Sequence, residues 1–112
     1  MLKCKNKIIC KNVKICKSIF SKALGLMFSF PINDKCLIFI FDNARRIDLH
    51  MFFVFYPIDV LFLDEGKKVV EIKERFLPFR IYYSKNKCNY VIELPLRVIK
   101  DKGIKVGDVL EW

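Results

Sequence analysis

The sequence lacks any long run of apolar residues. Its longest uncharged apolar stretch covers residues 49–58, about half of the ~20 residues that a helix needs to cross a bilayer. The N-terminal region also lacks the apolar segment of a signal peptide, because lysines interrupt it at Lys3, Lys5, Lys7 and Lys11. We therefore expect a cytoplasmic protein with no membrane association.

No two cysteines form a Cys-x-x-Cys pair, which is how most zinc sites begin. Phosphate loops, Ser-His-Asp triads and dinucleotide fingerprints are absent as well. We therefore expect no metal site, no cofactor and no recognisable catalytic motif. In a cytosolic protein the thiols should stay reduced, although pairing remains open if the source is a hyperthermophile. The five cysteines are Cys4, Cys10, Cys16, Cys36 and Cys88.

Acidic residues are missing from residues 1–33, which contain seven lysines; the first acid is Asp34. The formal net charge of +9 is therefore largely an N-terminal feature. Lys3, Lys5 and Lys7 are predicted to line one face of a strand, where solvated lysines oppose edge-to-edge pairing. The alternative is contact with nucleic-acid phosphates. Of the 21 basic residues, however, only five are Arg, the better bidentate phosphate ligand.

The composition favours one compact domain spanning residues 1–112. Hydrophobic residues make up 54% of the chain and aromatic residues 14%, enough for an aromatic-rich core. Many short apolar segments separated by turn signals predict a mainly β fold. We expect a small closed or nearly closed β-barrel with one or two short helices, and a two-layer α+β sandwich is the alternative. The predicted strands are 8–15, 36–41, 47–55, 58–63, 68–76, 79–83, 88–94 and 109–112, and the predicted helices are 19–26 and 96–102.

Alternation and glycine positions predict local details of these elements. In strand 68–76, Val70 and Ile72 should face the core while Glu71 and Lys73 face solvent. Gly66 should supply a positive φ in the preceding hairpin turn, and the helix 96–102 should end at Gly103.

Two carboxylates interrupt apolar strands and are the main candidates for a site. Asp59 follows Pro57, and Glu93 precedes Leu94. Asp59 either accepts backbone N–H groups at the bend after Pro57 or acts as a general acid or base with a raised pKa. Across a barrel, Asp59 and Glu93 can approach each other or Lys22, forming a cluster that binds a ligand, performs catalysis or only fixes the fold.

His50 is the only histidine and a weaker catalytic candidate. It is two residues from Asp48, so both share one face of the predicted strand and the carboxylate can orient the imidazole. No nucleophile accompanies the pair, and a hydrogen-bonded packing role is the favoured interpretation.

Three segments resemble a family known as domain of unknown function 192, in its archaeal form. Residues 22–28 read Lys-Ala-Leu-Gly-Leu-Met-Phe, similar to the family's Arg-x-x-Gly-Leu-Met-Phe element. Residues 50–64 resemble its central motif, and residues 90–95, followed by Gly-Ile at 103–104 and Gly-Asp at 107–108, resemble its C-terminal element. The resemblance implies a compact β-barrel-like domain and no particular activity.

Two departures from the family pattern bear on function. Lys22 stands where the family more often has Arg, which weakens a bidentate anion role at that position. Many bacterial members have Trp-Met-Lys-Asn-Thr where residues 50–54 read His-Met-Phe-Phe-Val. A function that depends on that Lys-Asn-Thr does not operate in this chain.

The sequence therefore favours a non-enzymatic β-barrel module that binds a small ligand or a protein partner, with Lys22, Asp59 and Glu93 as the candidate ligand-binding residues. One alternative is a small hydrolase- or isomerase-like enzyme that uses Asp59, Glu93 and His50. Another is a nucleic-acid-associated accessory protein that uses the N-terminal lysines.

Overall fold

The computed structural model of the chain describes residues 1–16, 35–45, 48–50, 57–77 and 81–112. Its elements are β1 (Leu2–Cys4), β2 (Lys7–Cys10), β3 (Asn12–Cys16), β4 (Lys35–Arg45), β5 (Asp48–His50), β6 (Ile58–Leu63), β7 (Val69–Phe76), β8 (Ile81–Tyr83), β9 (Cys88–Pro95), α2 (Val98–Lys102) and β10 (Leu110–Glu111). The fold is mainly β, as the sequence predicts. In this part of the chain, no helix has the length and apolar character needed to span a membrane.

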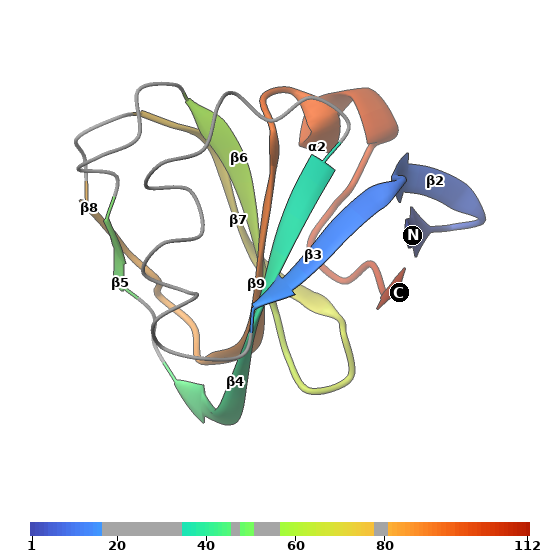
Figure 1. The fold of residues 1–112 in the computed structure, drawn as a ribbon. Helices are drawn as coiled ribbons and strands as arrows, with labels where there is room; N and C mark the ends of the chain where they lie inside the picture. Colours follow the sequence, from blue (N-terminus) through green and yellow to red (C-terminus); the bar gives the residue numbers. More distant parts are fainter. Residues whose placement is uncertain (17–34, 46–47, 51–56, 78–80) are drawn as a thin grey trace.

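A five-stranded sheet with the order β3-β4-β9-β6-β7 is the centre of the molecule. Its pairs are antiparallel except β3 with β4, which run parallel. A smaller sheet, β10-β1-β2, and helix α2 lie to one side of it, and the β5-β8 pair lies to the other (Figure 1). The central sheet therefore has elements on both faces.

The residues of the central strands alternate between two apolar clusters, one on each face. On β6, Leu61 and Leu63 belong to the cluster beneath α2 and the small sheet, whereas Val60 and Phe62 belong to the other. All six residues of β6 are buried, as expected for a strand covered on both faces. We call the first face the helix face and the second the Glu93 face, because Glu93 is paired with Val60 across the β9-β6 ladder.

A closed barrel is not confirmed in the described strands, and the alternative two-layer arrangement fits them better. A bridge between Lys68 and Val109 and a hydrogen bond from the Leu110 N–H to the Lys67 carbonyl join the start of β7 to β10. No described pairing joins β2 to β3, so the ladder remains open there. The predicted strand 8–15 is divided into β2 and β3.

Most predicted strands and the C-terminal helix are confirmed, with shifted ends, and β6 matches its prediction at both ends. The hairpin β1-β2 was not predicted. Its two-residue turn, Lys5-Asn6, has positive φ angles of 51° and 64°, a conformation usually signalled by Gly. Lys3, Lys5 and Lys7 therefore do not share one strand face, contrary to the prediction. The predicted helix 19–26 and most of the predicted strand 47–55 lie outside the described residues.

A bulge at Val70, between β6 and β7, overturns the predicted outward orientation of Glu71. Phe62 pairs with Glu71 while Leu63 pairs with Val69, so Val70 is an extra residue in the ladder. Because a bulge shifts the alternation by one residue, Glu71 is turned into the protein and is only 7% exposed. Val70 and Ile72 are partly buried, against opposite clusters.

The hairpin turn before β7 also differs from its prediction. The positive φ belongs to Lys67, at 63°, rather than to Gly66. The Asp64 side chain organises this turn, since its Oδ1 accepts the Gly66 and Lys68 N–H groups at 2.9 and 3.0 Å. Gly103 does end α2 in the left-handed conformation, as predicted.

Candidate functional site

Glu93 lies at the middle of an apolar sheet face. It pairs with Leu37 on β4 and with Val60 on β6. The remaining buried members of this face surround that row: Phe39, Ile58, Phe62, Phe76, Cys88 and Val91. The residue is therefore flanked by two neighbouring strands, and the described apolar side chains of this face offer its carboxyl group no hydrogen bond.

The carboxyl group of Glu93 is incompletely satisfied. The residue is 7% exposed, and its Oε2 is buried with no hydrogen-bond partner in the part of the chain that the structure describes. Burial alone raises the pKa of this carboxyl group from 4.5 to about 8. Buried polar atoms almost always have a partner in native proteins, and burying a carboxylate without one is strongly unfavourable. At neutral pH the group is therefore mostly protonated.

A second carboxyl group, that of Glu71, shapes one wall of the same face. Its oxygens accept the Tyr82 hydroxyl, the Lys85 and Asn86 N–H groups at 2.8 and 2.9 Å, and the Asn86 side-chain amide at 3.1 Å. Burial opposes its ionisation, but these donors together lower the pKa of Glu71. Glu71 is thus an anchor that joins β7 to β8 and to the loop before β9.

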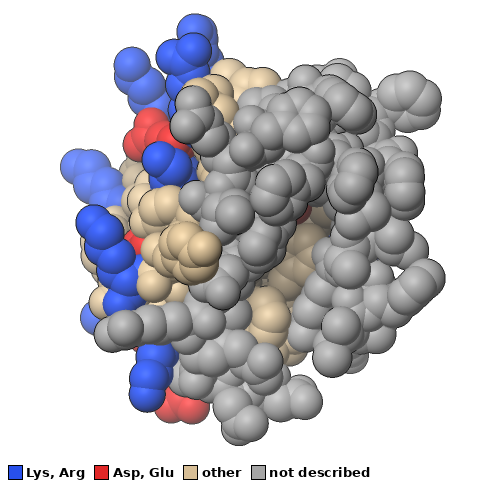
Figure 2. Space-filling model, turned by 90° about the vertical axis from the view of Figure 1, so that its left-hand side faces the viewer, with Lys and Arg blue, Asp and Glu red and all other residues tan. Residues whose placement is uncertain are grey.

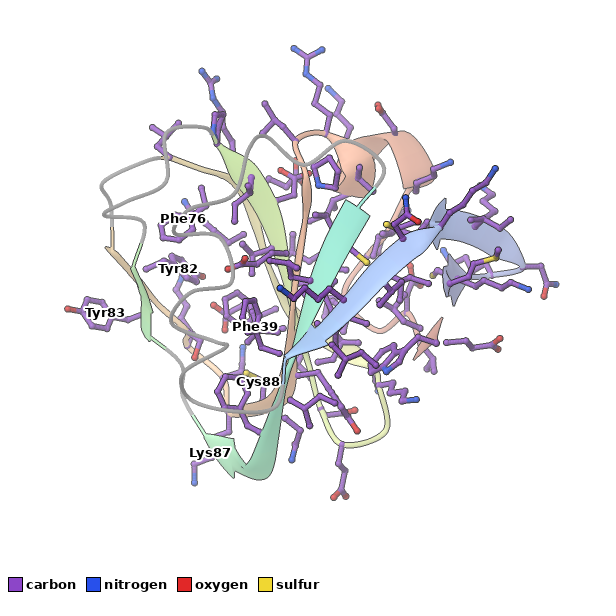
Figure 3. All side chains as sticks on the ribbon, viewed as in Figure 1. Phe39, Phe76, Tyr82, Tyr83, Lys87 and Cys88 are labelled. Atoms are coloured by element: carbon purple, nitrogen blue, oxygen red, sulfur yellow. The ribbon has the colours of Figure 1, made fainter. Side chains whose placement is uncertain are left out.

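Tyr82, Phe62 and Phe76 form an aromatic wall beside Glu93. The Tyr82 ring centroid lies 5.7 Å from that of Phe62 and 6.2 Å from that of Phe76. Lys73 Nζ lies 5.4 Å from the Tyr82 ring centroid, on this wall. Figure 3 shows Tyr82, Phe76, Phe39 and Cys88 gathered between the central sheet and β8, whereas Tyr83 points away.

Asp59 lies on the opposite face from Glu93. It pairs with Leu94, a member of the helix-face cluster, whereas Glu93 pairs with Val60. Asp59 is 1% exposed, and its oxygens accept the Arg75 N–H at 3.0 Å and the Ile99 N–H at 3.3 Å. The carboxylate joins the bulge at Arg75, where φ is 51°, to the first turn of α2. The structure does not bring Asp59 and Glu93 together.

The other two predicted site residues give less information. Lys22 lies outside the described residues. The backbone of His50 is described on β5, where it pairs with Ile81, and Asp48 pairs with Tyr83. Their side chains are outside the description, so the predicted Asp48–His50 pair stays a prediction.

Sequence reasoning missed Glu71 and Tyr82 as parts of this region. The alternation in strand 68–76 placed Glu71 outside, and only the bulge at Val70 turns it inward. A signal does exist in the sequence, because Ser84, Asn86 and Lys87 mark a tight loop whose N–H groups need acceptors. Pairing that loop with Glu71 requires the tertiary structure.

The described cysteines are thiols. Cys4, Cys10, Cys36 and Cys88 are buried and form no disulfide with one another. Burial raises the pKa of the Cys88 thiol to about 12, and it also raises that of Cys36, which is hydrogen-bonded to Cys10. In the described ranges, no group of three or more His, Cys, Asp or Glu side chains is arranged to hold a metal ion.

The lysines near the N-terminus are exposed and dispersed. Lys3 lies on β1, Lys5 in the turn, Lys7 on β2, and Lys14 on β3. Lys5 Nζ is 3.2 Å from Asp108 Oδ2, so its charge is partly compensated. Figure 2, which views the β5-β8 side of the molecule rather than the N-terminal strands, shows other Lys and Arg side chains along one edge, with acidic residues between them.

Comparison with known proteins identifies relatives over nearly the whole chain. A model of the DUF192 family, described as "Uncharacterized ACR", matches residues 2–112. The chain is 38% identical to a UPF0127 protein of Thermococcus sibiricus, covering 98% of this chain and 71% of that protein. It is 36% identical to a UPF0127 protein of Pyrococcus furiosus, covering 96% and 92% respectively.

Two solved structures have a similar fold. A protein of Sinorhizobium meliloti 1021, described as a "putative transcription regulator", matches with a TM-score of 0.83 and 27% identity, covering 88% of this chain and 79% of that one. A protein of unknown function from Novosphingobium aromaticivorans matches with a TM-score of 0.82 and 22% identity, covering 89% and 74%.

Proposed function

The chain belongs to the DUF192 family, and from that premise we propose that it is a mainly β module that binds a small molecule on the Glu93 face. The observation that carries the proposal is the buried Oε2 of Glu93, which has no hydrogen-bond partner among the described residues. A ligand with an apolar body and one polar group supplies what this atom lacks. The apolar body packs against the surrounding side chains.

The energetics support a functional rather than a structural role for Glu93. Asp59 and Glu71 show how buried carboxyl groups stabilise this fold, since each accepts at least two N–H groups. Glu93 instead leaves an oxygen unpaired, which is unfavourable by about 1–3 kcal/mol. Residues that lower stability in this way concentrate at functional sites.

The arrangement favours binding over a reaction that needs two carboxyl groups. Acid–base pairs act on one substrate from the same cavity. Asp59 and Glu93 are on opposite faces of the central sheet, and both oxygens of Asp59 accept backbone N–H groups. The proposal therefore includes no catalytic step, and the ligand enters and leaves unchanged.

Binding is tested with three probes of similar size: 2-phenylethanol, 2-phenylethylammonium and phenylacetate. The full chain is labelled with ¹⁵N and titrated with each probe, and amide shifts are followed by NMR. We expect saturable shifts for at least one probe at Leu37, Val60 and Glu93, where the three strands meet. The Glu93→Gln variant should alter the affinity, whereas Glu74→Gln, at an exposed position of β7, should not.

The proposal fails if the folded wild-type chain gives no saturable shift with any of the three probes. It also fails if the shifts saturate only at residues of the helix face, such as Leu94 and Ile99. Glu93→Leu serves as a second variant in case Glu93→Gln is poorly folded, since leucine fits the apolar surroundings.

A second candidate function is association with nucleic acid. Exposed lysines on β1, β2 and β3 support it, together with the description of the Sinorhizobium meliloti protein as a "putative transcription regulator". Counterion release makes such binding strongly dependent on salt, which provides the test argued in the Discussion.

A further inference from the structure

We infer that the ligand of the Glu93 face is an organic cation: a primary amine, carried as its ammonium ion, on an apolar or aromatic body. This inference rests on the proposed function and names the chemical class of its ligand. It depends on the polar group that is available, on the rings around it and on the lack of a described basic side chain that acts on Glu93.

The available polar group is a carboxyl with an open acceptor. Oε2 of Glu93 is buried and has no donor directed at it. An ammonium group donates hydrogen bonds and carries the opposite charge to the ionised carboxyl, so the bond it makes is charge-assisted and stronger than a neutral one. An anionic ligand would place a second negative charge beside Glu93, and Lys73, a cation described on this face, is directed at the Tyr82 ring instead.

The aromatic wall adds attraction for a cation. Phe39 and Phe62 flank the Glu93 row on the neighbouring strands, and Tyr82 packs on Phe62. Ring faces attract ammonium groups when water is excluded. This wall already holds one, since Lys73 Nζ lies 5.4 Å from the Tyr82 ring centroid.

The third observation is that no described basic side chain stabilises the ionised form of Glu93. Among the described residues, only desolvation shifts the pKa of Glu93, to about 8, and no basic side chain lowers it. At pH 7 about one molecule in ten therefore carries the carboxylate. Because a cation binds the ionised form of Glu93, its apparent affinity at pH 7 is reduced about tenfold. The charge-assisted hydrogen bond and the Coulomb attraction in a buried site offset this loss.

Among the described titratable groups that face this region, Glu93 is the one expected to change its protonation between pH 6 and pH 8. β4 and β6 contribute Leu37, Phe39, Val60 and Phe62, which do not ionise. On β8 and β9, the pKa values of Tyr82 and Cys88 are raised to about 12. On β7, the pKa of Glu71 is lowered, and Lys73 presents its ammonium group to Tyr82.

The test is the pH dependence of the affinity for 2-phenylethylammonium, measured by NMR titration of the full chain. We expect the affinity to rise about tenfold from pH 6 to pH 7 and to level off above pH 8, as Glu93 ionises. The neutral probe 2-phenylethanol should show no such rise. Glu93→Gln should abolish the pH dependence and weaken the cation at pH 8, and His50→Gln should preserve the dependence.

Each remaining outcome has a definite meaning. If 2-phenylethanol binds at the Glu93 face and 2-phenylethylammonium does not, the inference is overturned and the proposed function stands. If the pH dependence persists in Glu93→Gln or disappears in His50→Gln, another group binds the cation and the inference fails. If neither probe binds, both the inference and the proposed function fail.

Discussion

Three buried carboxyl groups among the described residues have different chemical environments, and each environment predicts a different response. Asp59 and Glu71 accept several N–H or O–H donors, whereas Glu93 has an oxygen with none. The first two stabilise the fold through these hydrogen bonds. Glu93 is tolerated mainly as a neutral acid, because burial disfavours its charge.

Glu93 should make the stability of the chain fall as the pH rises. Its folded-state pKa of about 8 lies above the unfolded value of 4.5, so the folded state binds the extra proton between these values. The free energy of unfolding is therefore unaffected by Glu93 below about pH 4.5 and declines up to about pH 8, by on the order of 4 kcal/mol. Denaturant melts from pH 5 to pH 9 measure this decline.

The Glu93→Gln variant should remove the decline, because its amide does not titrate. It should be close to the wild-type chain at pH 5 and clearly more stable at pH 9. Glu65→Gln, at an exposed turn position, controls for the loss of one surface charge. A wild-type stability that stays flat between pH 5 and pH 9 would show that Glu93 has a partner when ionised.

Asp59→Asn should lower the free energy of unfolding by on the order of 2 kcal/mol at pH 7. One amide oxygen can replace only one of the two acceptors used by Arg75 and Ile99, so one buried N–H group loses its partner. Urea melts measure the loss, and Asp101→Asn, exposed on α2, is the matched control.

The same experiment tests the earlier hypothesis of a buried ion pair with Lys22. Removing one partner of such a pair costs about 3–5 kcal/mol. If Asp59→Asn loses that much and Lys22→Met restores stability in the double variant, the ion pair exists and the backbone contacts are secondary. A loss unchanged by Lys22→Met supports the backbone role.

At the scale of single elements, two glycines lie at the ends of elements: Gly103 ends helix α2, and Gly66 lies in the turn before β7. Gly103 ends α2 at a φ of 65°, a region that residues with a Cβ rarely enter. Gly66 has no positive φ, and a Cβ there would meet the Asp64 carboxylate at an ordinary contact distance of 3.4 Å. The two glycines therefore have different reasons to be present.

The same substitution should have opposite effects at these two glycines. Gly103→Ala should destabilise the chain by about 1 kcal/mol, because alanine is strained at that φ. Gly66→Ala should leave stability unchanged or raise it by up to ~1 kcal/mol, because alanine restricts the unfolded chain. Thermal melts of the two variants compare them directly. Equal losses at both positions would contradict the assigned backbone angles.

At the scale of the whole molecule, the net charge of +9 bears on nucleic-acid binding, the second candidate function, which is tested through its salt dependence. If the N-terminal lysines bind nucleic acid, affinity for duplex DNA should fall linearly with salt on a logarithmic scale. Replacing Lys3, Lys5, Lys7 and Lys11 by Gln should weaken binding and make that slope shallower. Fluorescence anisotropy with a labelled duplex measures both quantities.

A matched variant separates a specific surface from the overall charge. Replacing Lys85, Lys87, Lys100 and Lys102, which are also exposed, removes the same number of charges elsewhere. Equal losses in the two variants would show that only net charge matters, and no binding at low salt would reject the candidate.

Three segments of the sequence were enough to indicate the family by resemblance. The mainly β fold, the position of most strands and the C-terminal helix with its Gly103 cap were predictable from local causes: apolar runs such as 58–63, turn residues and alternation. It also singled out Asp59 and Glu93, because a carboxylate within an apolar strand is visible without coordinates. The β1-β2 hairpin was not predicted, because its Lys5-Asn6 turn has positive φ angles but contains no glycine.

The environments of those two carboxyl groups depend on long-range contacts that no local pattern shows. The register of β6 against β9 places Asp59 and Glu93 on opposite faces, and a shift of one residue would have reversed that result. The bulge at Val70 turned Glu71 inward and gave Tyr82 its partner. Register and bulges depend on contacts between strands that are distant in sequence, and a local pattern carries no information about them.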